Sequence, residues 1–269
     1  MALDNFAFVL FRPKSAGNIG ASARALKNMG ISDLRIVTDE CRRPNVGRNP
    51  WPQQSARSEN VAEIMAVHAR DVLATARIHS DLRAALDDRT VVVGTTARKG
   101  LYRSEARPIR TAAPELVRLS STNRVAIVFG PEDCGLTNEE LKLCQRLITI
   151  PTAPEYPSLN LAQAVMIMAY ELMLAASAPP EVQAAERWAL SAEVNAMLER
   201  MAKALVAIGF LPADNPDHIM FALRAILGRA GLRPRELDIL NGIARQILWF
   251  GENGREILQR KRETGEKFR

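Results

Sequence analysis

Short apolar runs recur along the first part of the chain, and stretches with helical spacing separate them. Such runs are typical of strands in a parallel sheet that is covered by helices on both faces. The predicted strands are Phe6–Phe11, Leu34–Val37, Ala76–His79, Thr90–Gly94, Val125–Phe129 and Leu147–Ile150. The pattern therefore predicts an α/β domain that is built on a parallel sheet.

The ends of two helices are marked by residues that stop a helix. Ala21–Met29 is followed by Gly30, and glycine commonly ends helices. Leu159–Ser177 is a long apolar helix that runs into prolines at positions 179 and 180. Residues 41–54 hold three prolines together with Gly47 and Asn45, which predicts an irregular loop.

The pattern changes after the proline pair, because no strand candidate of any length follows position 184. Apolar residues instead repeat at helical spacing. They are Val194, Leu198, Met201, Leu205 and Ile208, and then Ile219, Leu223, Ile226 and Leu227. We therefore expect two domains, an α/β domain over residues 1–178 and a small helical domain over residues 184–269.

Composition narrows the class of protein. A chain of 269 residues that is 47% hydrophobic is long enough for one or two domains with a proper core. No apolar run approaches the ~18 residues of a membrane span, and the first residues lack the features of a signal peptide, so we expect a cytoplasmic protein. The net charge of +6, carried mostly by arginine, mildly favours a polyanionic partner.

Cysteine and histidine give no sign of a metal site. The three cysteines, at positions 41, 134 and 144, are too few and too irregularly placed for a disulfide framework or a Cys-x-x-Cys site. His68, His79 and His218 lack the spacing of metal ligands. We expect no metal.

Three distant segments share one feature, a strand that runs into a turn rich in glycine, proline and polar side chains. They are residues 13–20, which lead to Arg24, residues 129–136, and residues 154–160. Loops that follow the carboxyl ends of strands in an open α/β sheet converge on one edge, where ligands bind. The sequence therefore predicts one site that is built from three loops.

These segments resemble the three motifs of the SpoU branch of the SPOUT RNA methyltransferases. The resemblance rests on the Asn18–Arg24 spacing, on Gly130–Leu136 (Gly-x-Glu-x-x-Gly-Leu) and on Ser158–Asn160 (Ser-Leu-Asn). The text around the third motif, 153–157 and 161–171, is most similar to the TrmJ family. That resemblance implies a SPOUT fold with a carboxyl-terminal trefoil knot and a homodimer. It also implies 2′-O-methylation of tRNA at position 32 of the anticodon loop, with S-adenosylmethionine as donor.

Carried over position by position, the family pattern implies which residues contact the donor. They are Thr95, Thr96, Ala97, Gly130, Ile150, Pro157, Ser158 and Leu159. Several are apolar, which suits recognition by backbone groups, and glycine lets the backbone approach a ligand closely. Each glycine taken alone is equally consistent with a turn that merely ends a strand.

The same resemblance implies a catalytic set of Arg24, Asn18, Glu132 and Asn160. A guanidinium keeps its proton, so we expect Arg24 to grip the adjacent phosphate and stabilise the developing alkoxide, while water or a neighbouring group takes the proton. Asn18 either caps or shapes its loop or orients Arg24 or the ribose. Glu132 accepts hydrogen bonds from Asn160 or a loop amide, or is a surface carboxylate. Asn160 is expected to cap a helix and organise the site.

Other functions remain open at this point. They are a SpoU methyltransferase that acts on ribosomal RNA, a SPOUT protein that binds RNA without catalysis, and a KH module with residues 17–20 as its Gly-x-x-Gly loop. Ser158 is not expected to be a hydrolase nucleophile, because no histidine follows it within the first domain. Cys134 is expected to play no part, although Asp133 and Cys134 depart from the commoner SpoU text.

The helical domain is the feature that favours the TrmJ family over other SpoU enzymes. We expect it to capture tRNA or to make dimer contacts that assemble the capture surface. Arginines cluster around Gly231, at positions 224, 229, 233 and 235. They either neutralise tRNA phosphates or pair with Glu236 and Asp238 on a solvated helix face.

Overall fold

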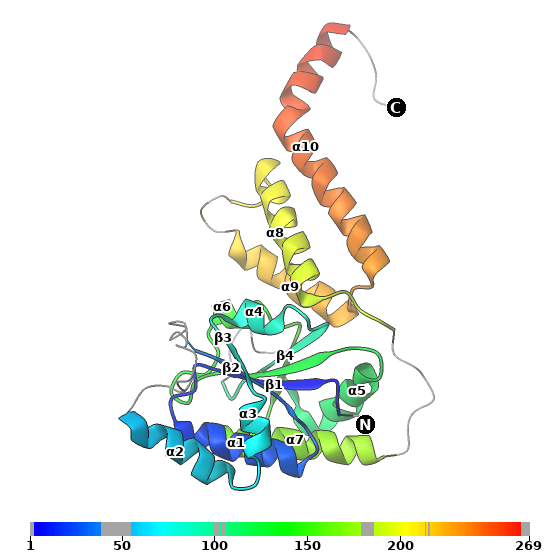
Figure 1. Ribbon diagram of the computed structural model, residues 1–269. Coiled ribbons are helices and arrows are strands. Elements are labelled where there is room, and N and C mark those ends of the chain that lie inside the picture. Colours follow the sequence, from blue (N-terminus) through cyan, green and yellow to red (C-terminus); the bar gives the residue numbers. More distant parts are fainter. Residues whose placement is uncertain are drawn as a thin grey trace. The chain divides into compact units, whose positions relative to one another are not determined.

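The computed structural model describes residues 3–38, 55–98, 103, 106–178, 186–212, 214 and 216–264, without the side chains of 55–60, 218 and 254–264. The predicted loop at 41–54 and the proline pair at 179 and 180 lie outside these ranges. The chain divides into two compact units, Met1–Ser191 and Ala192–Arg269. Figure 1 shows the elements of each unit.

The first unit is built on a seven-stranded sheet with the order β3-β2-β1-β6-β4-β7-β5, in which every neighbouring pair is parallel. The strands are β1 Phe6–Phe11, β2 Asp33–Val37, β3 Arg77–His79, β4 Val91–Thr95, β5 Arg107–Pro108, β6 Val125–Phe129 and β7 Arg146–Thr149. All six predicted strands are confirmed. Sequence reading missed β5, a two-residue strand at the sheet edge, where proline is tolerated.

Helices cover both faces of this sheet. They are α1 Ala16–Asn28, α2 Ser55–Ala66, α3 Arg70–Ala74, α4 Leu82–Leu86, α5 Ile109–Ser120, α6 Asn138–Leu141 and α7 Leu161–Ser177. In Figure 1, α1, α2, α3 and α7 lie on one side of the strands, and α4 and α6 lie on the other. The parallel α/β fold predicted for the first domain is therefore confirmed.

Alternation along the strands sends side chains into two apolar cores. Phe8 of β1 and Ile127 of β6 belong to the larger core, which α1, α5 and α7 complete. Val9 and Val128, one position further along the same strands, belong to the smaller core beneath α4 and α6. Because both faces are buried, these strands are apolar throughout rather than alternating with polar residues.

The first helix begins five residues earlier than the sequence predicts. Ser15 is its amino-terminal cap, and the Ser15 hydroxyl accepts a hydrogen bond from the backbone N–H of Asn18. Gly20, which suggested a loop, lies within the helix, and the residue there must be glycine because α2 crosses it closely. A Cβ at Gly20 would lie 2.0 Å from the backbone oxygen of Ala62.

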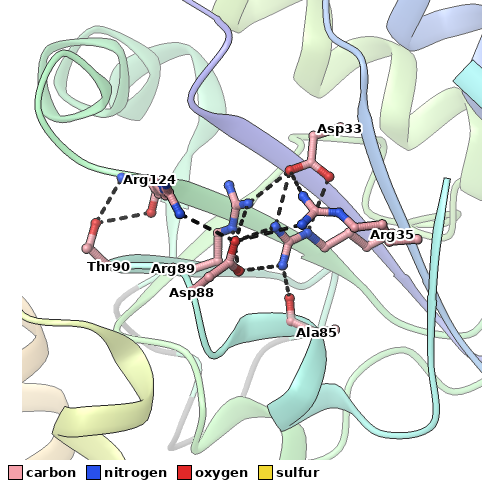
Figure 2. A network of polar contacts seen from close by, with 8 residues as sticks. Asp33, Arg35, Ala85, Asp88, Arg89, Thr90 and Arg124 are labelled. Atoms are coloured by element: carbon pink, nitrogen blue, oxygen red, sulfur yellow. Dashed lines mark hydrogen bonds and ion pairs between the residues drawn. The ribbon is translucent and has the colours of Figure 1, made fainter. Parts of the chain in front are cut away.

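A network of charged side chains lies where β2 begins and where the chain enters β4 (Figure 2). The Arg35 guanidinium, 1% exposed, donates to Asp88 at 2.6 and 2.9 Å and to the carbonyl of Ala85 at 2.7 Å. Arg89 donates to Asp33 at 2.9 Å and to Asp88 at 2.8 Å. These contacts link two separate segments at the amino edge of the sheet.

Residues 186–191 also bind along the amino edge of the first unit. Asn123, just before β6, donates to the carbonyl of Glu186 and accepts from the backbone N–H of Trp188, both at 2.8 Å. The N–H of Ser191 donates to the carbonyl of Arg89 at 2.6 Å. The compact units accordingly divide after Ser191, whereas the sequence placed the division between residues 178 and 184.

In the residues that the structure describes, the second unit contains helices and no strand, as predicted. Its helices are α8 Ser191–Ala207, α9 Asp217–Ala230 and α10 Pro234–Thr264. A Cβ at Gly251 of α10 would lie 2.9 Å from the Cβ of Ala207, so glycine permits close packing there. Gly231, with a φ of 72°, ends α9. Across the described ranges, no helix combines the length and apolar character needed to cross a membrane.

Candidate functional site

The three polar loops meet at the carboxyl edge of the sheet. β1, β6, β4 and β7 are consecutive in the strand order, so the segments that follow them are neighbours. The first loop enters α1, the second follows β6, and the third runs from β7 to α7. Hydrogen bonds between side chains of all three loops connect them directly.

A relay of hydrogen bonds crosses the three loops. The Asn160 Nδ2 donates to Asn18 Oδ1 at 2.9 Å, and the Asn18 Nδ2 donates to Glu132 Oε1 at 2.7 Å. The other oxygen of Glu132 accepts from the backbone N–H of Lys14 at 3.0 Å. Asn160, Asn18, Glu132 and the Lys14 amide thus form one chain of contacts, called the relay below.

The relay decides between several expectations. Asn160 does cap α7, because its Oδ1 accepts from the backbone N–H groups of Ala162 and Gln163. Asn18 is not a helix cap, since Ser15 has that position. Of the partners expected for Glu132, the loop amide is found, and its side-chain partner is Asn18 rather than Asn160.

Arg24 lies on α1 at a distance from the relay. It follows Asn18 by six residues, which is about 9 Å along a helix axis. Its side chain is exposed, and its guanidinium makes no hydrogen bond or ion pair with the described residues. The structure therefore brings Asn18, Glu132 and Asn160 together and leaves Arg24 accessible from solvent.

The residues expected to contact the donor lie at the same edge. β4 ends at Thr95, and Thr96 and Ala97 follow it. Gly130 follows β6, Ile150 follows β7, and 157–159 precede α7. The Thr95 hydroxyl donates to the carbonyl of Val128 at 2.9 Å, and the Thr96 N–H donates to the carbonyl of Ile148 at 3.0 Å. The end of β4 is therefore held on both sides, by β6 and by β7.

Gly130 has a packing reason of its own. A Cβ at this position would lie 2.3 Å from the backbone carbon of Gly135 and 2.3 Å from the nitrogen of Leu136. The loop after β6 therefore closes on itself so tightly that only glycine fits. Arg103 supports the same loop by donating to the carbonyl of Leu136 at 3.1 Å.

Charged groups flank the relay at the protein surface. The Lys14 ammonium forms an ion pair with Asp133, and this hydrogen bond raises the pKa of Lys14 and lowers the pKa of Asp133. Desolvation, followed by the hydrogen bond with Asp133, raises the pKa of the neighbouring Cys134 thiol. A thiol with a raised pKa is a poor nucleophile, in keeping with the expectation that Cys134 plays no part.

Sequence reading did not identify Lys14 or Ser15 as part of this site. Serine immediately before a helical stretch is a signal for an amino-terminal cap, and that signal was available at Ser15. No comparable signal marks Lys14, whose partners Glu132 and Asp133 are more than a hundred residues away. The KH alternative is wrong, because Gly17 and Gly20 lie inside α1.

Two family models match the chain, one for each unit. The model of the SpoU rRNA Methylase family matches residues 5–170. The model of the tRNA methyltransferase TrmJ C-terminal domain matches residues 192–263.

Proteins with similar sequences and structures extend across both units. The tRNA (cytidine/uridine/adenosine-2′-O-)-methyltransferase TrmJ of Pseudomonas aeruginosa is 36% identical over 253 residues, which are 90% of this chain and 93% of that protein. The tRNA (cytidine/uridine-2′-O-)-methyltransferase TrmJ of Yersinia pestis is 34% identical over 251 residues, 91% of this chain and 92% of that protein. The crystal structure of TrmJ from Z. mobilis ZM4 has a TM-score of 0.72 and 31% identity, with 90% of this chain and 98% of that chain covered. The chain therefore belongs to the SpoU methylase family and, within it, to the TrmJ group.

Proposed function

We propose that this protein transfers a methyl group from S-adenosylmethionine to a ribose 2′-hydroxyl of tRNA, at position 32 of the anticodon loop. The observation that carries the proposal is the relay, which joins the three SpoU motif loops through Asn18, Glu132 and Asn160. The named activity of the TrmJ relatives supports tRNA as the substrate. The TrmJ C-terminal domain match at 192–263 favours tRNA over ribosomal RNA.

The carboxyl edge of the sheet suits the methyl donor. S-adenosylmethionine supplies the methyl group on a positively charged sulfur. The donor would be held by turns that lie beside an apolar core and offer backbone N–H and C=O groups. The residues of these turns are Thr95–Ala97, Gly130, Ile150 and 157–159. Of these, Ala97, Pro157 and Ser158 are exposed.

The chemistry that we assign to the side chains is positioning and electrostatic stabilisation. The relay fixes the Asn18 amide between two partners, so its orientation is set before a ribose binds. The exposed guanidinium of Arg24 grips a phosphate and stabilises the developing alkoxide. Water or a neighbouring group takes the proton of the 2′-hydroxyl.

We also propose a homodimer in which α7 takes part. This helix presents an apolar stripe at helical spacing on the side away from the sheet, through Ile167, Tyr170 and Leu174. Tyr170 and Leu174 are each 42% exposed. Analytical ultracentrifugation should show a dimer for the intact protein and a monomer for Tyr170→Asp/Leu174→Asp. A monomeric intact protein would contradict the proposal.

Two further features are proposed on the family resemblance. One is the trefoil knot within residues 130–160. It is supported by the strand order, in which β6 and β7 lie on opposite sides of β4, so the chain crosses β4 between them.

The other is tRNA capture by the second unit. We place this activity in the cytoplasm. Arg229 and Arg235 are exposed in the second unit, and Arg233 pairs with Glu236 at 2.9 Å, as the alternative of paired charges expects for that residue.

The test is mass spectrometry of nucleosides from tRNA that has been incubated with the protein and isotopically labelled donor. We expect label in a 2′-O-methylated nucleoside and, when the tRNA is cut by a ribonuclease into oligonucleotides instead, in the fragment that carries position 32. A second reaction with ribosomal RNA tests the alternative substrate. Label in ribosomal RNA alone would overturn the choice of tRNA, and no label in either RNA would overturn the activity.

A further inference from the structure

The ion pair between Lys14 and Asp133 lies next to the relay and yet is open to solvent. Lys14 precedes the cap of α1, and Asp133 follows Glu132 in the loop after β6. Their side chains are 60% and 54% exposed. The backbone N–H of Lys14 is bound to Glu132, so the base of this side chain is fixed at the site while its ammonium lies at the surface.

Such a pair is poorly explained as a support for the fold. Exposed ion pairs contribute little to stability, because water screens the two charges and two long side chains must be held in one geometry. The two loops are already joined by the Asn18–Glu132 and Lys14 N–Glu132 hydrogen bonds. A surface carboxylate beside an RNA site also carries a cost, because it repels phosphate unless a cation neutralises it.

We propose that Lys14 is a tRNA phosphate-binding residue and that Asp133 holds it in an internal ion pair which the RNA must displace. The carboxylate of Asp133 occupies the place that a phosphate oxygen takes in the complex. This deepens the proposed function, since it requires that tRNA docks over the carboxyl edge of the sheet. Asp133 then weakens tRNA binding and eases release of the methylated product.

The proposal predicts that substitutions of the two partners change the tRNA affinity in opposite directions. Lys14→Met should weaken tRNA binding by about fivefold at low salt. It should also reduce the salt slope, which is the slope of the logarithm of the binding constant against the logarithm of the salt concentration, by about one unit, because one phosphate contact is lost. Asp133→Asn should tighten binding by about two- to fivefold, since an exposed pair no longer has to be broken. Its salt slope should not fall. A pair that only clasps two loops would give weaker binding for both variants.

The experiment is a tRNA-binding titration by fluorescence anisotropy over a series of salt concentrations, with the full-length protein. The wild type, Lys14→Met, Asp133→Asn and the double variant are compared, and thermal unfolding establishes that each is folded. Substitution of the Lys14 side chain leaves its backbone N–H in place. The matched control is the exposed Lys27–Asp71 pair at the far end of α1, tested as Lys27→Met and Asp71→Asn.

The outcomes separate the two proposals. Wild-type protein that does not bind tRNA overturns both the proposed function and this inference. If the wild type binds tRNA and Asp133→Asn does not bind it more tightly, only this inference is overturned. The inference is also overturned if Asp133→Asn tightens tRNA binding as much in the Lys14→Met background as in the wild type. Asp133 would then repel RNA directly rather than occupy Lys14.

Discussion

The two edges of one sheet carry polar clusters of opposite kinds. At the amino edge, Arg35 and Arg89 are buried and their charges are fully paired with Asp33 and Asp88 (Figure 2). At the carboxyl edge, neutral amides and a single carboxylate form the relay, and cations stay accessible. The charges of the amino edge join segments of the fold. The charges of the carboxyl edge lie at the surface, where a polyanion can reach them.

The largest effect is expected at the amino edge. Arg35→Met should lower the free energy of unfolding by about 3 to 5 kcal/mol, because the Ala85 carbonyl and the partly buried carboxylates of Asp33 and Asp88 lose the charged donors of a buried guanidinium. Urea denaturation measures the loss. Arg77→Met is the control, since Arg77 binds the same Asp33 but is 49% exposed, and we expect it to cost less than about 1 kcal/mol. Equal losses of unfolding free energy for the two variants would show that the burial of Arg35 is not the reason for its effect.

Arg24 tests the carboxyl edge. Arg24→Ala should reduce methyl transfer by about 10² to 10³, the range for one preorganised electrostatic contact, and should leave unfolding and donor binding nearly unchanged. Arg24→Lys should recover little, because an ammonium lacks the planar fork of a guanidinium. Rates come from labelled methyl incorporation, with Lys27→Met as a control on the same helix. A wild-type rate for Arg24→Lys would rule out bidentate phosphate gripping.

The relay should give a smaller effect on rate. Asn18→Ala removes two hydrogen bonds, one of them to the carboxylate of Glu132, so methyl transfer should fall by about 10- to 100-fold. Single-turnover kinetics with saturating tRNA isolate the chemical step. Asn28→Ala, at the opposite end of the same helix, is the control. A loss confined to tRNA affinity would mean that the relay binds RNA and does not position the acceptor.

The smallest effect concerns pH and Glu115, a half-buried carboxylate of α5. Burial alone would raise the pKa of Glu115, but Arg146 and Arg107 outweigh it and leave the pKa lowered. Glu115 therefore stabilises the fold above its ordinary pKa of 4.5, and this contribution is lost as the pH falls through the lowered value. In the wild type, unfolding should become easier below about pH 4.5, by less than about 1 kcal/mol from this group. Glu115→Gln should flatten that part of the profile, and an unchanged profile would contradict the assignment.

The sequence predicted those features of the fold and the site that depend on the local pattern of residues along the chain. The apolar runs located six strands, and the three motifs located Asn18, Glu132 and Asn160 before the structure joined them. Their pairing was not predictable, because each residue has several chemically suitable partners. The start of α1 was misplaced, because the close approach of α2 that requires Gly20 is a tertiary contact.

The amino-edge network had no signal at all in the sequence. Arg35 lies within a buried strand, where an isolated charge is rarely expected. Its partner Asp88 is 53 residues away, in a turn that resembles any other polar turn. The pair forms because α4 packs against β2 and β3, which brings Asp88, just after α4, beside Arg35.

The attachment of residues 186–191 to the amino edge has a consequence for the mechanics of the whole chain. Asn123 and Arg89 bind this segment to the first unit, so the chain leaves that unit only after Ser191, where α8 begins. The effective tether between the two units is thus the junction at Ser191 and not the longer stretch that follows α7. The effective concentration of one unit at the other depends on the free length of the tether between them. Here three hydrogen bonds of Asn123 and Arg89 with residues 186–191 set that length.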